Sequence, residues 1–156
     1  MKKIMCLAVA AVCVFALASC SGKPSSLDLD AAQQAISDIG IYGELYYPDD
    51  NILDAYGIDA AIIEKGVITM PAFIVHSSLY IIALPKEGEE AELKTQLDGF
   101  MTQHQKVWEV YLPDQYKLVK DRMETTLETK EGIYYIYIIS TDNDAVLEAI
   151  KTGLVE

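Results

Sequence analysis

The fold of this chain is decided by Ile133-Tyr134-Tyr135-Ile136-Tyr137-Ile138-Ile139, a run of β-branched and aromatic residues. Such residues favour strands, and a run that is apolar on both faces is typical of a strand inside a sheet. Leu79 to Leu84 has the same character and is stopped by Pro85, so we expect a second, central strand there. The two segments together predict an apolar sheet at the centre of the molecule.

Weaker strand patterns precede each of these two segments. Met123 to Thr129 alternates apolar and polar residues, which predicts a half-buried strand, and Lys130-Glu131-Gly132 then turns the chain. Val67 to Val75 is apolar and β-branched, but Pro71 indicates an edge strand or a bulge. His76-Ser77-Ser78 is expected to turn the chain after it. Each central strand is therefore predicted to belong to a hairpin.

The clearest helical pattern runs from Gly88 to Trp108. Its apolar residues recur at intervals of three and four, and we expect the following to face the core: Leu93, Leu97, Phe100, Met101, His104, Val107 and Trp108. A first helix is predicted over about 30–39, capped by Asp28 or Asp30. A last helix is predicted from Thr141-Asp142-Asn143-Asp144 through about Lys151.

Short helical turns are predicted in three further places. Asp50 or Asn51 is expected to cap the first, and Asp114 to Lys120 forms the last. Between them, a turn capped by Asp59 is expected to run through Glu64 and to close at Gly66.

The order of these elements predicts the fold class. After the N-terminal helix come two units, each a hairpin followed by a helix, which indicates an α+β domain. We expect a two-layer architecture, with an antiparallel sheet and its helices packed on one face. A single domain is predicted over residues 28–156, because the chain suits one hydrophobic core.

The N-terminus has the layout of a secretory signal peptide. Met1-Lys2-Lys3 is basic, Ile4 to Leu17 carries no charge, and residues 21–27 are polar and flexible. The apolar run is shorter than the roughly 20 residues that a membrane-spanning helix needs. We therefore predict a signal peptide over residues 1–19 and a tether over residues 20–27. An ordinary secreted protein and an N-terminal membrane helix are the alternatives.

Leu17-Ala18-Ser19-Cys20 resembles the lipobox of bacterial lipoproteins. The resemblance implies that Cys20 receives a diacylglycerol, becomes the mature N-terminus and carries acyl chains such as palmitate. A lipid with two chains gives stable membrane anchoring. The implied location is the cell membrane, with the domain on its extracytoplasmic face and the lipid as its membrane contact.

Composition limits the functions of the mature chain. The formal charge is −12, and loss of Lys2 and Lys3 with the signal leaves −14, so the surface repels nucleic acid and anionic lipid. Cys6 and Cys13 lie in the signal. Cys20 would then be the one mature cysteine, which excludes an intramolecular disulfide, thiol catalysis and cysteine-ligated metal sites.

Several motifs resemble those of a known family. They are the lipobox, Tyr56-Gly57-Ile58-Asp59 before the first hairpin, Gln103 through Tyr111-Leu112-Pro113, and Gly132-Ile133-Tyr134 before the last strand. Together they resemble the small bacterial lipoproteins grouped as domain of unknown function four-three-five-eight, over roughly residues 20–151. The resemblance implies a cell-envelope protein of the Gram-positive type and supplies no activity.

The sequence contains no recognised catalytic motif, and we predict neither a cofactor nor a metal site. His104 lies on the apolar stripe of the long helix, where a core or rim role is expected, and His76 lies in a turn beside serines. Two acidic clusters, Asp49-Asp50-Asn51 with Asp54 and Asp142-Asn143-Asp144, have oxygen ligands that suit Ca²⁺. A turn and a helix cap are the favoured interpretations of these clusters.

Tyrosines are the most suggestive group for ligand binding. Tyr135 and Tyr137 share one face of the last strand, and Tyr46 and Tyr47 lie in an irregular segment. Aromatic rings with hydroxyl groups suit a sugar or a peptide. The favoured interpretation, however, is that the N-terminal segment packs over these tyrosines and buries them.

The sequence therefore predicts a non-catalytic binding or accessory module of the cell envelope, with an envelope protein or a glycan as partner. A small hydrolase that uses two of the 24 carboxylates and a glycan-binding protein are the alternatives.

Overall fold

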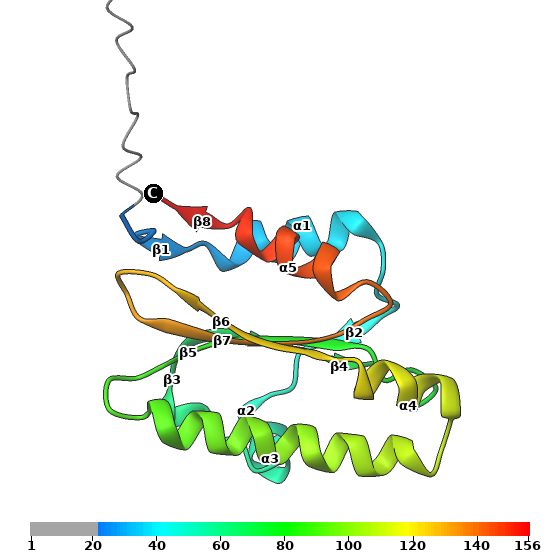
Figure 1. Cartoon of the computed structure of the whole chain (residues 1–156). Helices are drawn as coiled ribbons and strands as arrows, with labels where there is room; N and C mark the ends of the chain where they lie inside the picture. Colours follow the sequence, from blue (N-terminus) through cyan, green and yellow to red (C-terminus); the bar gives the residue numbers. More distant parts are fainter. Residues whose placement is uncertain (1–21) are drawn as a thin grey trace, which may run out of the picture.

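The computed structural model describes residues 22–156, so the predicted signal peptide and Cys20 lie outside the described residues. A four-stranded antiparallel sheet forms the centre (Figure 1). Its strands stand in the order β3 (Ile63–Ile68), β5 (Leu79–Pro85), β7 (Ile133–Ile139) and β6 (Met123–Glu128). The two apolar segments thus lie in the middle, as predicted, and the α+β class is confirmed.

The register of β5 against β7 divides their side chains between two cores. Ile82 pairs with Ile136. Because side chains alternate along a strand, each apolar strand contributes to both faces of the sheet. Tyr80, Ile82, Leu84, Tyr134, Ile136 and Ile138 face one core. Leu79, Ile81, Ala83, Tyr137 and Ile139 face the other.

The first core lies under α1 (Leu29–Ile39) and α5 (Asn143–Lys151), which pack against each other above the sheet (Figure 1). The short strands β1 (Ser26–Leu27) and β8 (Leu154–Val155) pair antiparallel beside them. The start of the described chain and its C-terminus therefore lie together on this face.

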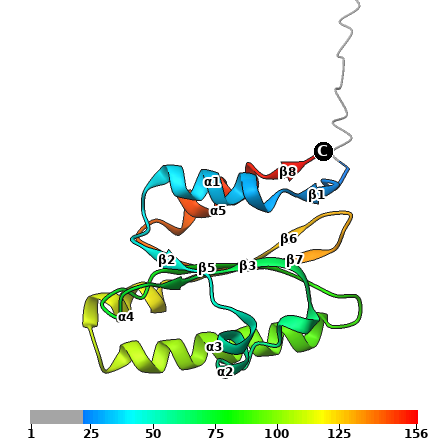
Figure 2. The same ribbon diagram turned by 180° about the vertical axis from the view of Figure 1, so that it is seen from behind.

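The second core lies under α3 (Glu90–Glu109) and α4 (Pro113–Lys120) on the opposite face (Figure 2). Two further helical segments cover the same face, α2 (Asp50–Ala55) and the 3-10 helix η1 (Ala60–Ile62). Beside them, β2 (Leu45–Tyr46) pairs with β4 (Met70–Pro71). Among residues 22–156, no helix combines the length and the hydropathy of a membrane span.

The layering differs from the prediction. Helices cover both faces of the sheet, so the domain has three layers and not two. The physical reason lies in β5 and β7, because strands that are apolar on both faces need cover on both. The first helix and the last supply the second cover, since they pack together on the face that α3 leaves open.

The segment before β5 is the largest error of element placement. A strand was expected over Val67 to Val75, but β3 already begins at Ile63, and residues 72–78 form a loop. Gly66 closes no helical turn and lies inside β3. There, an added Cβ would stand 2.6 Å from the Ile82 carbonyl oxygen of the neighbouring strand. A close approach between strands explains this glycine.

Most predicted helix ends are confirmed. Asp28 caps α1, and Gly40 ends it in the left-handed conformation with a φ of 63°. Asp142 caps α5, and Asp59 caps the 3-10 helix. The cap of α2 is Asp49, whose side chain accepts a hydrogen bond from the Ile52 amide, so the expectation of Asp50 or Asn51 is wrong by one or two positions.

Candidate functional site

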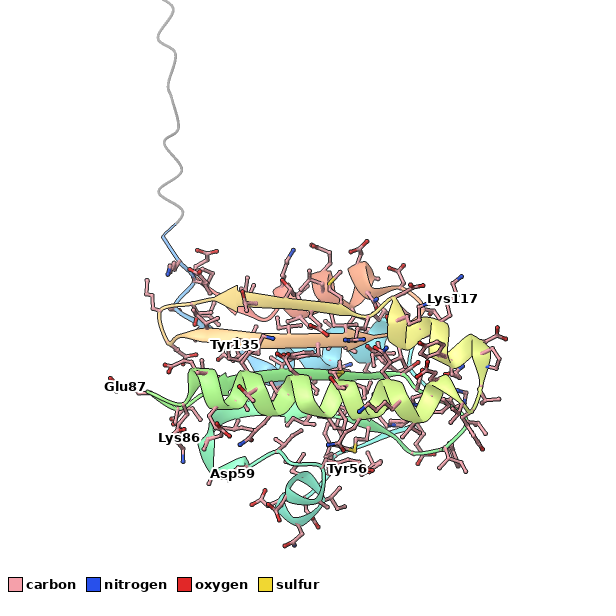
Figure 3. All side chains as sticks on the ribbon, turned by 60° about the horizontal axis from the view of Figure 1, so that its bottom comes forward. Tyr56, Asp59, Lys86, Glu87, Lys117 and Tyr135 are labelled. Carbon is pink, nitrogen blue, oxygen red and sulfur yellow. The ribbon has the colours of Figure 1, made fainter. Side chains whose placement is uncertain are left out.

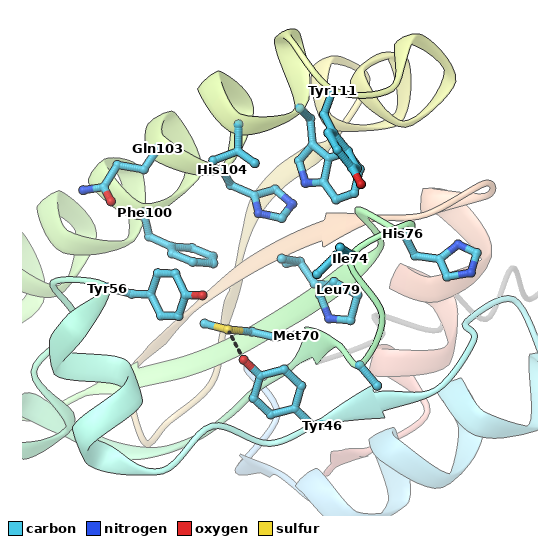
Figure 4. Close-up of a pocket in the computed structure, with 14 residues that line it drawn as sticks. Tyr46, Tyr56, Met70, Ile74, His76, Leu79, Phe100, Gln103, His104 and Tyr111 are labelled. Atoms are coloured by element: carbon cyan, nitrogen blue, oxygen red, sulfur yellow. Dashed lines mark hydrogen bonds between the residues drawn. The ribbon is translucent and has the colours of Figure 1, made fainter.

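An apolar cleft opens on the α3 face, between the second half of α3, the end of α2 and the loop over residues 72–78 (Figure 4). Its volume is about 570 Å³, which lies within the usual range for ligand sites. The lining residues include aromatic and aliphatic side chains from these segments and from β2, for example Tyr46, Tyr56, Ile74, Phe100, Trp108 and Tyr111. We call this feature the aromatic cleft. No aspartate or glutamate is among its described lining residues.

Five rings form a continuous row along the cleft. The ring centroids of Tyr56 and Phe100 are 5.6 Å apart, those of Phe100 and His104 5.8 Å, and those of His104 and Trp108 6.0 Å. Tyr111 follows at 5.7 Å from Trp108. The spacing along α3 explains three of the rings, because residues 100, 104 and 108 lie on one side of the helix, and Tyr111 follows in the turn after it. Tilted and edge-on contacts of this kind stabilise aromatic pairs.

The mouth of the cleft is unusually apolar for a surface. Phe100 and Trp108 are buried and form its floor. Around them, Ile74 is 78% exposed, Val107 60% and Val110 86%. We call the exposed set the apolar rim, and it consists of Phe73, Ile74, Val75, Val107, Val110 and Tyr111. Contiguous exposed apolar side chains are typical of binding surfaces, which makes this cleft the candidate site.

A buried serine holds the loop over residues 72–78 in place. The Ser77 amide donates to Gln115 Oε1 on α4 at 2.8 Å, and its hydroxyl lies 3.1 Å from the same oxygen. His104 Nε2 lies 3.1 Å from the Ser77 carbonyl oxygen, so this nitrogen carries the proton and donates it. The loop that carries half of the apolar rim is thus tied to both α3 and α4.

His104 is held in its neutral form by its surroundings. Burial lowers its pKa, the hydrogen bond to the Ser77 carbonyl opposes that shift, and the positive charge of Arg122 adds to it. The net direction is downward, so the cleft wall carries no charge from His104 at neutral pH. The expected role at the core or rim of α3 is confirmed, since His104 is half-buried between Phe100 and Trp108.

The predicted ligand-binding tyrosines do not meet in one site. Tyr137 is buried beneath α3, and its hydroxyl donates to Asp98 Oδ1 at 2.6 Å. Tyr135 is half-buried in a groove beside Lys94 and Glu124. This groove and Tyr56 lie on opposite sides of α3 (Figure 3). The cover over Tyr137 is α3 and not the N-terminal segment that we expected.

The other two tyrosines also separate. Tyr46 lines the aromatic cleft, where its hydroxyl donates to the Met70 sulfur at 3.2 Å (Figure 4). Tyr47 points into a second cavity of about 200 Å³, which Tyr42 and Tyr80 also line. Since β-strand neighbours point to opposite sides, consecutive residues of this segment reach different cavities. As ligand contacts, all four tyrosines remain predictions, and only Tyr46 belongs to the cleft.

The acidic clusters serve as helix caps. Asp49 and Asp142 each accept a hydrogen bond from the amide three residues ahead. Asn143 accepts from the Ser140 amide and donates to the Asp121 carbonyl. Within residues 22–156, no group of three or more histidine, cysteine, aspartate or glutamate side chains converges as a metal site would. The expected helix cap is confirmed for the second cluster, whereas the first cluster caps and begins α2 where a turn was expected.

Sequence reasoning missed the cleft as a site. It placed Phe100, His104, Val107 and Trp108 on one inward face, but Val107 is exposed at the mouth. The signal was present in Phe73-Ile74-Val75, an apolar run that was assigned to a strand and instead forms an exposed loop. An apolar run that fails to pair is a marker of a binding surface.

A family model described as "Domain of unknown function (DUF4358)" matches residues 39–140. The chain belongs to this family. The match begins at the end of α1 and closes just after β7, so the shared DUF4358 region contains the four-stranded sheet, α3, α4 and the whole aromatic cleft. The domain family predicted from the sequence motifs is confirmed over residues 39–140, while the lipoprotein part of that prediction stays a prediction. No curated protein and no solved structure matches the chain significantly.

Proposed function

We propose that this DUF4358 protein is a lipid-anchored, extracytoplasmic binding module that holds an apolar ligand group in the aromatic cleft. The observation that carries the proposal is the cleft itself, with buried Phe100 and Trp108 at its floor and exposed apolar side chains at its mouth. Exposed apolar surface costs free energy in water, and a ligand that covers it recovers that cost.

The absence of charge on the described cleft wall favours binding over hydrolysis. A glycosidase needs one carboxylic acid with a raised pKa near a second carboxylate. The carboxyl groups of Asp98, Glu128 and Glu131 shift the other way, since ion pairs and hydrogen bonds lower the pKa of each against the desolvation that burial brings. These three groups are therefore poor candidates for a general acid.

The location rests on the N-terminal sequence. A basic start, an apolar run without charge and Leu17-Ala18-Ser19-Cys20 fit a signal peptide followed by a lipidation site. The described domain starts a few residues later, with β1. A lipid at Cys20 would hold the domain at the outer surface of the membrane, within reach of other envelope components.

Fractionation of cells that express Cys20→Ala tests the anchor. We expect the variant to accumulate as uncleaved precursor or to leave the membrane, whereas Cys13→Ala, a matched change within the predicted signal, should behave like the unmodified chain. Equal membrane retention of a correctly processed Cys20→Ala protein would contradict the anchor.

Fluorescence tests the binding role, because Trp108 is the one tryptophan of the chain and lies in the cleft floor. We expect the neutral apolar probe N-phenyl-1-naphthylamine to bind and to change Trp108 emission. Val107→Ser at the mouth should weaken binding, and Val155→Ser, an equally small change on the opposite face, should not. Binding that is unaffected by Val107→Ser, or no binding, would overturn the proposal.

A further inference from the structure

We propose that the occupant of the aromatic cleft is the apolar face of an amphipathic helix, flanked by basic residues, that belongs to another protein. This inference rests on the proposed binding function and names the class of partner. Three features of the described residues carry it: the extent of the apolar rim, the spacing of its residues at the end of α3, and the charges beside the cleft.

The apolar rim extends beyond the cavity. Phe73 is 56% exposed and Val75 50%, and neither lines the cleft, although Ile74 between them does. Val110 is likewise exposed without lining it. A small ligand inside the cleft would leave these side chains in water, whereas a protein segment lying across the mouth would cover them together with the cleft.

The end of α3 offers the spacing of a helix interface. Val107 lies on the last turn of α3, and Val110 and Tyr111 follow directly after the helix ends at Glu109, three and four residues beyond Val107. Ile74 from the loop faces the same cleft. Ridges formed by such residues pack into the grooves of a second helix, and a helix in an apolar groove is a recurring mode of peptide recognition.

The acidic residues near the cleft favour a partner helix with basic residues at its ends. Three carboxylates and one lysine stand within two residues of a cleft-lining residue: Glu44, Asp54, Glu109 and Lys106. Asp98 is excluded from this set, because Lys94 and Tyr137 hold its carboxylate on the side of the Tyr135 groove. The described domain as a whole is also strongly acidic. A second copy of the chain or an anionic membrane would be repelled, and basic flanks on a partner would be attracted.

The position of the cleft also separates it from the anchored end. Gly22 leads into β1, which pairs with β8 beside α1 and α5, whereas α3 covers the other face of the sheet (Figures 1 and 2). The cleft is lined by residues of α3 and so lies on that other face. An occupant of the cleft is therefore expected to approach from the side away from β1.

Titration of two synthetic helices tests this assignment. Both peptides lack tryptophan and share one apolar face of leucine and phenylalanine, but one has lysines at both ends and the other has glutamates. The protein is the mature chain, residues 20–156 with Cys20→Ser so that no lipid competes for the cleft, and Trp108 emission reports binding. We expect the lysine-ended peptide to bind at least about tenfold tighter at low salt, and the difference to shrink as salt screens the charges.

Matched variants locate the contact and the charge effect. Ile74→Ser with Val107→Ser should weaken binding of the lysine-ended peptide about tenfold or more, while Ile133→Ser with Val155→Ser, exposed positions away from the cleft, should leave it unchanged. Glu109→Gln should reduce the preference for lysine ends. Circular dichroism of each variant confirms that it is folded.

The outcomes separate this inference from the proposed function. Equal binding of both peptides, or binding of the naphthylamine probe but of neither peptide, would overturn the basic-helix partner and leave a cleft that binds other apolar ligands. Self-association through the rim, seen as a dimer in sedimentation and lost in the Ile74→Ser, Val107→Ser variant, would also overturn it. If neither the peptides nor the probe bind, the proposed function fails as well.

Discussion

The two faces of the central sheet are formed by the same strands but are covered differently. Beneath α1 and α5, the core contains Ile82, Ile136 and Ile138 without exposure, and the face has exposed apolar residues only as isolated positions such as Ile39 and Val155. Beneath α3, an equally dense core continues into a cleft with an apolar rim. The first face is closed by packing except at the small cavity of about 200 Å³ beside Tyr42 and Tyr47, and the second leaves a larger, apolar surface available.

Stability and ligand binding are therefore expected to depend on different faces of the domain. Substitutions beneath α1 and α5 should lower the free energy of unfolding and leave the cleft intact. Substitutions at the apolar rim should weaken ligand binding and leave the free energy of unfolding nearly unchanged, because a side chain that is already in water contributes little to folding. The predictions below test this division, in decreasing order of effect on stability.

Ile136→Ala should have the largest effect. Ile136 is fully buried and pairs with Ile82 at the centre of the closed face. Loss of its side chain removes apolar contacts and leaves a cavity, so the free energy of unfolding should fall by about 2–5 kcal/mol. Urea unfolding followed by circular dichroism measures this change, and a loss below about 1 kcal/mol would mean that this face is loosely packed.

Gly153→Ala should come next. An added Cβ would collide with the Asp28 carbonyl oxygen and stand 3.2 Å from Ala32, at the point where the chain ends meet. Overpacking of this kind costs about 1–3 kcal/mol. Gly99→Ala is the matched control, because nothing stands within 4 Å of its Cβ and alanine favours the helix that contains it. Equal thermal stabilities of the two variants would contradict the close contact.

Tyr137→Phe should cost about 1 kcal/mol, since it removes the hydrogen bond to Asp98. Burial raises the pKa of Tyr137, and the Asp98 carboxylate raises it further. Desolvation would raise the pKa of Asp98, but the hydrogen bonds from Lys94 and Tyr137 outweigh it, so the net shift of this pKa is downward. The lowered carboxyl pKa contributes stability above its ordinary value of 3.8, and this contribution is lost as pH falls through the folded-state value.

Carboxyl titration by NMR checks the same variant. The pKa of Asp98 should rise toward its ordinary value in Tyr137→Phe and stay unchanged in Tyr135→Phe. If both variants leave the Asp98 titration alone, the hydrogen bond does not stabilise the carboxylate.

Acidification should lower the free energy of unfolding through protonation of His104. Its lowered pKa means that the unfolded chain binds the proton more readily, so stability is complete above the ordinary value of 6.5 and falls as pH drops below it. His104→Gln keeps a donor for the Ser77 carbonyl and removes the titration. Thermal unfolding between about pH 7.5 and pH 5.5 should therefore change less in the variant than in the unmodified chain, and identical pH profiles would count against a buried neutral imidazole.

Val107→Ser should have the smallest effect on folding, within about 0.5 kcal/mol, because Val107 is 60% exposed. Its effect on ligand binding is expected to be the largest of this series. A variant that loses stability and binding in parallel would show that the rim belongs to the core.

The sequence predicted most elements of the sheet and helices, because β5, β7 and α3 have strong periodicity or strong apolar character. It failed where tertiary context decides. The sequence predicted the helices α1 and α5 but not that both pack on the face opposite α3. Residues 72–78 have strand-like composition, yet Ser77 is fixed to α4 and α3 by hydrogen bonds that connect distant parts of the chain.

The candidate site shows the same limit. The sequence shows that aromatic residues recur at positions 100, 104, 108 and 111. Their exposure depends on how far α2 and the loop over residues 72–78 cover them. Four tyrosines were grouped by composition, and the register and the helix packing separated them. Periodicity shows which face of an element is apolar, and packing decides which part of that face stays open.

The most direct test of the division between the two faces is an NMR titration of the mature chain with N-phenyl-1-naphthylamine. The account predicts chemical-shift changes confined to residues 72–78 and 100–111 together with Tyr46 and Tyr56, and none in α1 or α5. Shift changes centred on α1 and α5 would contradict it, because they would place the open apolar surface on the face that is described here as closed.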